Sequence, residues 1–152
     1  ILVFDGQGNI TNRRNTYADY KANREIKRIT NYQVFSTLDE ESESIATQMM
    51  RLLDYLKCLP VNISIIDKIE ADDTIAYLSN KLEDEVIIYS ADQDFLQLVN
   101  NKVTVFSPIK KKFYKPQDVF DQYGLYPHNF ITMKCLMGDK SDNLPGVKGL
   151  GP

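Results

Sequence analysis

Two acidic residues of this chain are followed closely by a glycine-rich turn. Asp139 and Asp142 lie three residues apart in the run Gly138-Asp139-Lys140-Ser141-Asp142-Asn143, a spacing that lets both carboxylates face one point. Carboxylate oxygens without a nearby His or Cys favour Mg²⁺ or Mn²⁺ over zinc. The glycines at positions 146, 149 and 151 allow a phosphate to approach the backbone closely. The combination predicts metal-dependent chemistry on a nucleic acid, although the hexapeptide alone is also compatible with an ordinary polar turn.

Further acidic residues stand where predicted strands end. The apolar runs 1–4, 63–66 and 86–89 have the length and composition of buried strands. The acids that follow them are Asp5, then Glu70, Asp72 and Asp73, then Asp92 and Asp94. Each group alone is weak, because acids also favour the first turn of a helix and Asp is a common N-cap. Together they are expected at one edge of a mostly parallel α/β sheet flanked by helices, where ligands bind and mutual repulsion calls for a cation.

The elements that must position these acids follow from periodicity. Residues 38–59 have helical periodicity, and the apolar positions within it are interpreted as core, namely Met49, Leu52, Leu53 and Leu56. A strand over 103–106 is followed by a lysine-rich hairpin tip or edge at 110–112. Pro116 and Pro127 each stand in the first turn of a predicted helix.

The bulk composition excludes some classes of function. With 152 residues, 43% of them hydrophobic, the chain has enough apolar material for one globular core. Cys58 and Cys135 are predicted to be buried free thiols, and His128 has no catalytic partner at a recognisable spacing, so a Cys–His or Ser–His nucleophile is not supported. No apolar run reaches membrane-spanning length, and we expect a cytoplasmic monomer. The formal charge of −3 does not exclude DNA, because two divalent ions would bring it to +1.

In combination and order, these segments resemble the 5′-nuclease family of flap endonucleases and 5′→3′ exonucleases, which includes the N-terminal domain of bacterial DNA polymerase I and phage enzymes of the T5 and T4 type. The resemblance covers nearly the whole chain. It is carried by Val3-Phe4-Asp5, Tyr20-Lys21-Ala22-Asn23-Arg24, Glu70-Ala71-Asp72-Asp73, Ser90-Ala91-Asp92-Gln93-Asp94, and the run from Gly138 to Gly151. The stretch 107–112 is similar to phage members, which favours a phage protein and hence the host cytoplasm.

The resemblance implies a PIN-like catalytic core over residues 1–137, with a helical arch at about 12–45. It implies a metal-binding loop and the start of a helix-hairpin-helix over 138–152. Two ions are implied, one held by Asp5, Glu70, Asp72 and Asp73, the other by Asp92, Asp94, Asp139 and Asp142. The family normally opens with a further strand that carries an early ligand, and the chain begins at what resembles the second such strand. We therefore expect the first strand to be missing and the helix-hairpin-helix to be truncated.

The resemblance also implies the DNA contacts. Lys21 and Arg24 are expected at the base of the arch, where they would grip the scissile phosphate. The same basic segment carries further candidates, Arg13, Arg14, Tyr20 and Lys27, whose cations can neutralise phosphates while the ring stacks on a base. A solvated helix face is the alternative interpretation of this segment. The turn formed by Gly146, Val147, Lys148, Gly149 and Gly151 resembles one that binds duplex backbone, in some cases with K⁺.

The predicted function is a divalent-metal-dependent 5′→3′ exonuclease or flap endonuclease that hydrolyses phosphodiester bonds near the 5′ ends of DNA or of an RNA primer. Its expected catalytic residues are Lys21, Arg24, Asp5, Glu70, Asp72, Asp92 and Asp94. A DNA polymerase, a clamp or a single-strand-binding protein is the expected kind of partner.

Three other classes of protein could carry some of these acidic residues. A Toprim-like phosphoryl-transfer domain would leave Asp139, Asp142 and the glycine turn without a role. A haloacid-dehalogenase-like phosphatase would need a second Asp at the position of Gln7. A structure-specific DNA-binding module without catalysis stays open, and it would bind a flap substrate while leaving it intact.

Overall fold

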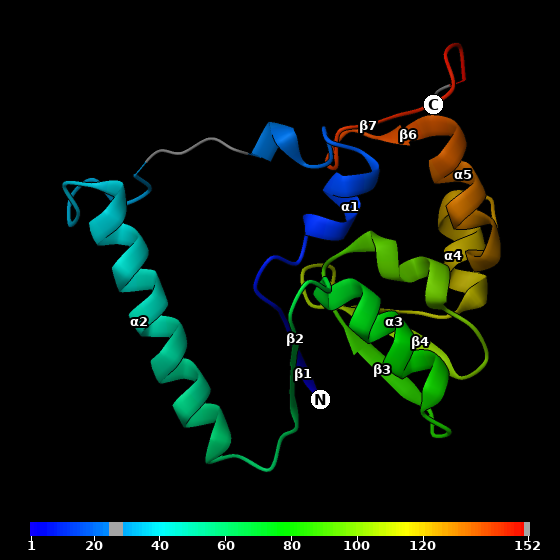
Figure 1. The fold of residues 1–152 in the computed structure, drawn as a ribbon. Coiled ribbons are helices and arrows are strands. Elements are labelled where there is room, and N and C mark those ends of the chain that lie inside the picture. The colour runs from blue at the N-terminus through cyan, green and yellow to red at the C-terminus, as the bar shows by residue number, and fades with distance from the viewer. Residues whose placement is uncertain (25–28, 151–152) are drawn as a thin grey trace.

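The structure is a computed structural model that describes residues 1–24 and 29–150 (Figure 1). Its larger elements, in chain order, are β1 (Leu2–Asp5), α1 (Thr11–Thr16), α2 (Leu38–Lys57), β2 (Ile63–Ile66), α3 (Ala71–Lys81), β3 (Val86–Tyr89), β4 (Val103–Ser107), β5 (Lys112–Tyr114), α4 (Pro116–Tyr123), α5 (Phe130–Met137), β6 (Gly138–Asp139) and β7 (Leu144–Pro145). Three short 3₁₀ helices connect them, η1 (Ala22–Arg24), η2 (Gln93–Leu98) and η3 (Pro127–Asn129).

The strands confirm the predicted α/β class with mostly parallel pairing. β1 pairs with β2 in parallel, with Leu2 opposite Ile63, and β3 pairs with β4 in parallel, with Val86 opposite Val103. β5 adds an antiparallel edge to β4, so the lysine-rich tip predicted at 110–112 is the turn of that hairpin and the start of β5. All of the parallel strands end close to acidic residues or to the loops that carry them.

The parallel strands form two separate small sheets instead of one continuous sheet. Among the strands of the described residues, β1 and β3 each have a partner on one side only, and residues of both strands line a shared cavity of about 530 Å³. Its lining is mostly aliphatic and includes Leu2, Val3, Leu78, Ile87 and Ile88.

The core lies on one face of the β3–β4–β5 sheet. Burial alternates along β4, where Val103, Val105 and Ser107 are buried and the residues between them are half-buried. These valines pack with the buried side chains of the neighbouring elements, namely Ile88, Phe95, Leu96, Val99, Tyr114, Val119 and Phe130. η2 follows directly from β3 and contributes Phe95 and Leu96, so the acids at its start are attached to the best-packed part of the molecule.

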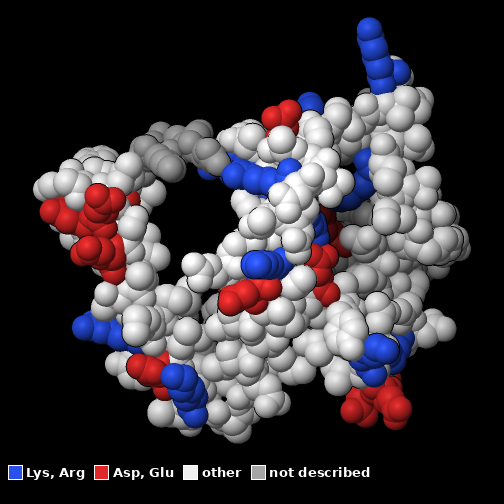
Figure 2. Space-filling model, in the orientation of Figure 1, with Lys and Arg blue, Asp and Glu red and all other residues white. Residues whose placement is uncertain are grey.

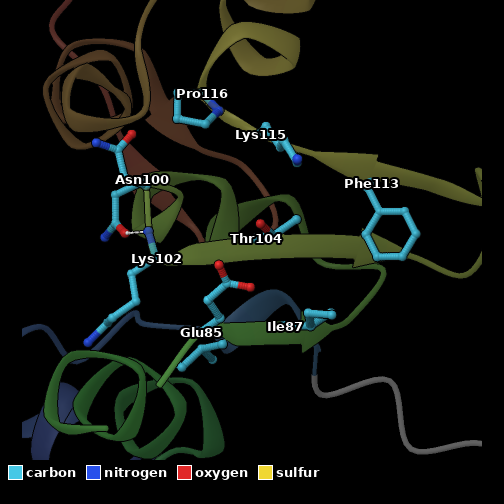
Figure 3. Close-up of a pocket in the computed structure, with 10 residues that line it drawn as sticks. Glu85, Ile87, Asn100, Lys102, Thr104, Phe113, Lys115 and Pro116 are labelled. Atoms are coloured by element: carbon cyan, nitrogen blue, oxygen red, sulfur yellow. Dashed lines mark hydrogen bonds between the residues drawn. The ribbon is translucent and has the colours of Figure 1, made fainter. Parts of the chain in front are cut away.

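The opposite face of this sheet is hollowed into a pocket of about 480 Å³ (Figure 3). Glu85 and Lys102 lie there, immediately before β3 and β4, so the pocket is at the amino ends of the parallel strands. It is therefore at the end of the sheet away from the acids that follow the strands.

Helix α2 stands apart from the sheets, as Figure 1 shows. A capping box begins it, because the Thr37 side chain accepts a hydrogen bond from the Glu40 N–H (3.2 Å) and the Glu40 side chain accepts one from the Thr37 N–H (3.3 Å). The prediction that its apolar positions are core was wrong: Met49 and Leu52 are 42% and 43% exposed. Leu53 and Leu56 are half-buried.

The two cysteines are also exposed, because Cys58 follows the detached helix α2 and Cys135 of α5 lines an open pocket. The prediction of buried thiols was therefore wrong, and the prediction of free thiols is confirmed. Among the residues that the structure describes, no helix is both long enough and apolar enough to cross a bilayer.

The different burial of two leucines gives a direct test of this division. Leu96 is 2% exposed in the core, so Leu96→Ala should lower the free energy of unfolding by about 2–5 kcal/mol. Leu52→Ala is the matched control on α2 and should cost less than about 1 kcal/mol, because the side chain is already exposed to water. Urea denaturation followed by circular dichroism measures both values. An equal loss for the two variants would mean that α2 packs into the core.

Candidate active site

Asp5 and Glu70 join the end of β1 to the start of α3. Asp5 is the last residue of β1 and accepts a hydrogen bond from the Ala71 N–H, 2.8 Å away, at the first residue of α3. Glu70 is the residue that precedes the helix, and it is only 3% exposed. A helix N-terminus favours negative charge, so this junction stabilises the carboxylates that gather there.

Asp72 shows that the gathered carboxylates repel one another. It lies in the first turn of α3, where burial raises the pKa of its carboxyl and the negative charges of Asp92, Glu70 and Asp5 raise it further. Asp92 itself begins η2 and accepts a hydrogen bond from the Asp94 N–H at 2.8 Å. The acids that follow three different strands therefore lie within electrostatic reach of one another, as predicted from their positions in the sequence.

A tight hairpin presents the two remaining acids. β6 and β7 pair across residues 138–145, and a Cβ on Gly138 would come within 2.4 Å of the Gly146 nitrogen. Gly138 also has a positive φ of 76°, so a larger residue would be strained there. Within the hairpin, Asp139 Oδ1 accepts hydrogen bonds from the Ser141 N–H (2.8 Å) and the Ser141 hydroxyl (2.6 Å).

Lys134 bridges Asp139 to the acids of η2. Its ammonium lies 2.8 Å from Asp139 Oδ2 and also bonds Asp94 Oδ1. Burial raises the pKa of Asp139, but the Lys134 ammonium and the hydrogen bonds from Ser141 outweigh it and hold the pKa well below its usual range. Sequence reasoning missed Lys134. Its signal was available, because it is the one charged residue in the apolar helix Phe130–Met137.

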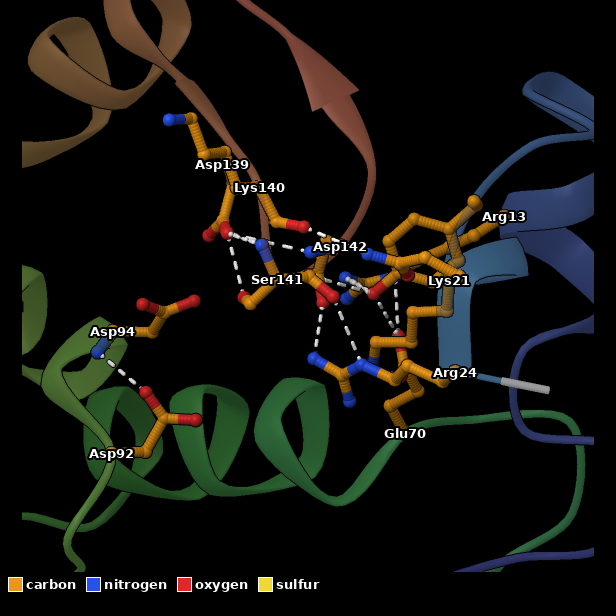
Figure 4. A network of polar contacts seen from close by, with 12 residues as sticks. Arg13, Lys21, Arg24, Glu70, Asp92, Asp94, Asp139, Lys140, Ser141 and Asp142 are labelled. Carbon is orange, nitrogen blue, oxygen red and sulfur yellow. Dashed lines mark hydrogen bonds and ion pairs between the residues drawn. The ribbon is translucent and has the colours of Figure 1, made fainter. Parts of the chain in front are cut away.

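A second group of cations faces Glu70 (Figure 4). The Arg13 guanidinium lies 2.8 Å from Glu70 Oε2, and the Lys21 ammonium bonds Glu70 Oε1. The hydroxyl of the buried Tyr20 lies between Glu70 Oε2 (3.1 Å) and Asp142 Oδ2 (3.2 Å). Asp142 therefore contacts the Glu70 group, while Asp139 turns toward Asp94.

Residues 20–24 are held against the hairpin by several bonds. Arg24 pairs with Asp142 at 2.6 Å and donates to the Ser141 carbonyl at 3.0 Å. The Lys21 N–H donates to the Asp142 carbonyl at 2.9 Å, with Lys21 in the left-handed region at φ 54°. The two basic residues predicted to grip a phosphate thus both point at carboxylates of the site.

A pocket of about 460 Å³ is lined by residues of α3, η2, α5 and the 138–145 hairpin. Five of the eight candidate ligands line it, namely Asp72, Asp73, Asp94, Asp139 and Asp142. Arg13 and Lys134 line it too, and Arg13 pairs with Asp73 at 2.7 Å. Figure 2 shows acidic and basic side chains next to one another near the centre of the view, while a separate acidic group covers the start of α2 at the left.

The donor set suits a hard divalent cation, because all eight candidates are carboxylates. As they stand, no three His, Cys, Asp or Glu side chains within residues 1–24 and 29–150 are arranged so that they could hold a metal ion. Lysine and arginine side chains face several of the acids instead. Burial, and after it the charges of Asp92 and Glu70, raise the pKa of the Asp72 carboxyl, so the site disfavours further negative charge. The carboxylate donors therefore fit a divalent ion by their chemistry, and the individual ligands stay a prediction.

The remaining predicted DNA contacts lie around this site or outside the described residues. Arg14 donates to the Tyr20 carbonyl at 3.1 Å. The Val147 N–H donates to the Leu136 carbonyl at 2.8 Å, which anchors the glycine turn to α5, and Lys148 in that turn is exposed. No helix follows β7 within the described residues, so the start of a helix-hairpin-helix stays a prediction. Lys27 and Gly151 lie outside the described part of the chain.

Comparisons with known proteins identify relatives of this chain. The model of the family described as 5′-3′ exonuclease, N-terminal resolvase-like domain, matches residues 1–124. The 5′-3′ exonuclease of Aquifex aeolicus is 32% identical over an alignment of 155 residues that covers 100% of this chain and 48% of the relative. DNA polymerase I of Bacillus subtilis is 36% identical over 158 residues, which cover 99% of this chain and 16% of the polymerase. The chain thus spans about half the length of the curated exonuclease that it matches, and less of the polymerase.

Two solved structures resemble the whole fold. T5 5′-exonuclease with bound zinc has a TM-score of 0.76 and 28% identity, and covers 98% of this chain and 55% of its own. A complex of bacteriophage T5 flap endonuclease with DNA and metal ions has a TM-score of 0.74 and 26% identity, with 98% and 54% covered.

The lowered pKa of Asp139 predicts a pH dependence of stability. A carboxyl with a depressed folded-state pKa stabilises the fold fully above its unfolded pKa, about 3.9, and loses that contribution as the pH falls toward the folded value. The difference in unfolding free energy between the unaltered protein and Asp139→Asn, measured in chelator, should therefore narrow as the pH falls from 5 to 2. Asp54→Asn removes an exposed ion pair with Lys57 and should change little at any pH. A constant difference for Asp139→Asn would contradict the ion-pair assignment.

Proposed function

Because the chain belongs to the family of 5′-3′ exonuclease N-terminal resolvase-like domains, we propose that it is the catalytic core of a divalent-metal-dependent nuclease that hydrolyses phosphodiester bonds near 5′ ends. The observation that carries the proposal is the convergence of acids from α3, η2 and the 138–145 hairpin on one pocket that Arg13 and Lys134 also line. Lys21 and Arg24 pair with Glu70 and Asp142 of the same site. A purely structural role would give no reason for burying mutually repelling carboxylates.

The proposed ligands fall into two sets. Asp5, Glu70, Asp72 and Asp73 would hold one Mg²⁺ or Mn²⁺ ion, and Asp92, Asp94, Asp139 and Asp142 would hold a second. When bound, two such ions lower the pKa of a coordinated water and stabilise charge on the attacking and leaving oxygens, so that no protein nucleophile is needed.

Lys21 and Arg24 supply the charge that the phosphate needs. Each now pairs with a proposed ligand, Lys21 with Glu70 and Arg24 with Asp142, so each would turn to the substrate once the carboxylates are neutralised. A cation that approaches the phosphate as negative charge grows in the transition state raises the rate, because its contact is stronger there than in the ground state.

DNA with a 5′ flap or 5′ end, or an RNA primer, is the proposed substrate. The likeness to a T5 flap endonuclease complexed with DNA supports it, and relatives named DNA polymerase I support a polymerase as partner. The basic segment would contact the DNA backbone through Arg13, Arg14, Tyr20 and Lys27. The glycine turn would contact it together with K⁺, through Gly146, Val147, Lys148, Gly149 and Gly151. We place this activity in the cytoplasm.

The free edges of β1 and β3 support the proposal that the family's further strand lies between them. The cavity of about 530 Å³ has an aliphatic lining that suits an apolar strand, which would make the two sheets continuous. Such a strand would also add the early acidic ligand.

One observation favours a second candidate. Arg13, Lys21, Arg24 and Lys134 already neutralise acids of the site, as they would in a DNA-binding module that has lost catalysis. Such a module would shift a flap duplex in a gel without cleaving it.

Cleavage of a 5′-labelled flap duplex by the protein with the further strand restored separates the two candidates. We expect product formation in Mg²⁺ or Mn²⁺ that chelator abolishes. The double variant Asp92→Asn, Asp94→Asn should lose more than roughly 100-fold in activity. Loss of a residue that only hydrogen-bonds a metal ligand typically costs about 10- to 100-fold, and these two residues are proposed as ligands themselves. Asp54→Asn, far from the pocket on α2, should retain full activity. Bound but intact DNA at saturating protein and metal would support the inactive module.

Lys21→Ala separates transition-state stabilisation from binding. We expect kcat to fall by roughly 100-fold, while DNA affinity changes by less than about fivefold. Lys148→Ala, in the exposed glycine turn, should do the opposite and weaken affinity with little effect on kcat. Single-turnover kinetics and fluorescence anisotropy provide the two values. A loss of affinity alone in Lys21→Ala would refute the assigned role.

A further inference from the structure

Lys134 has a place in the site that the metal ligands alone do not explain. We propose that Lys134 is an internal counter-cation that holds Asp94 and Asp139 together in the metal-free protein, and that a divalent ion enters there only by displacing it. The inference rests on the proposed metal site and extends it to a competition between a side chain and an ion.

The position of Lys134 brings together segments that are distant in the chain. Its ammonium bonds Asp94, at the start of η2, and Asp139, in β6, across 40 residues and 5 residues respectively. The Lys134 side chain is only 29% exposed. It is the one charged side chain of α5 and lines the pocket of about 460 Å³. The lysine stem therefore crosses apolar surface to deliver one charge to two carboxylates.

The oxygen atoms of Asp139 make the competition direct. Oδ1 already accepts hydrogen bonds from the Ser141 N–H at 2.8 Å and the Ser141 hydroxyl at 2.6 Å. Oδ2 is the oxygen that faces Lys134, at 2.8 Å. An ion that binds Oδ2 therefore competes with the ammonium for the same oxygen.

Charge favours replacement of the Lys134 ammonium by a divalent ion, but the replacement has a cost in free energy. A divalent ion brings two positive charges to the pair where Lys134 brings one, but the partly buried ammonium must give up charge-assisted hydrogen bonds to two carboxylates. The affinity for the ion is consequently lower than the carboxylates alone would provide. Removing the ammonium should raise it.

Mn²⁺ binding measured by titration calorimetry and electron paramagnetic resonance tests the proposal without any catalytic readout. We expect Lys134→Met to bind one Mn²⁺ roughly fivefold more tightly than the unaltered protein. Lys57→Met is the matched control, because it removes a lysine from an ion pair of 3.0 Å on α2, away from the pocket, and it should leave Mn²⁺ affinity unchanged. Unchanged or weaker Mn²⁺ binding by folded Lys134→Met would overturn the inference. Absence of Mn²⁺ binding by the unaltered protein would overturn the proposed function along with it.

A second measurement needs no variant. Acetylation of lysines, read by mass spectrometry, should increase severalfold at Lys134 when Mg²⁺ is added, because the displaced ammonium loses its two carboxylate partners. The reactivity of Lys57 should stay constant. A reactivity of Lys134 that does not respond to saturating Mg²⁺ would contradict displacement.

Discussion

Repulsion among carboxylates is the constraint on which the arrangement of this molecule depends. It contributes at Asp72, where burial raises the pKa of the carboxyl and the charges of Asp92, Glu70 and Asp5 raise it further. Such a group of acids persists only where cations offset it. In this structure the cations are arginines and lysines, and the ion pairs they form are also what joins residues 13–24, the start of α3 and the 138–145 hairpin into one site.

Different interactions hold the core and the site in place. The apolar cluster around β4 fixes η2, and with it Asp94, while the hairpin and the basic segment are held largely by polar bonds. Metal ions can replace the lysine and arginine side chains, and phosphates can replace the carboxylates, because these ligands offer the same charges. The ion pairs of the site can therefore be replaced by bonds to its ligands when those bind.

Local patterns foretold what depends on local structure. The strands over 63–66 and 86–89 and the acids behind them followed from short apolar runs, and parallel pairing placed those acids together. Periodicity identified the apolar face of α2 but could not say what covers it, so the assignment of Met49 and Leu52 to the core failed. The pairs Lys134–Asp94 and Arg13–Asp73 span 40 and 60 residues, and no sequence spacing encodes such contacts. The division into two sheets is likewise a matter of long-range pairing.

A crystal structure of the protein grown with Mn²⁺ would show whether the gathered carboxylates form a metal centre. We expect anomalous density beside Asp72 and between Asp94 and Asp139, with the Lys134 ammonium turned away from both acids. Saturating Mn²⁺ without anomalous density, and with Lys134 still bonded to Asp94 and Asp139, would contradict it.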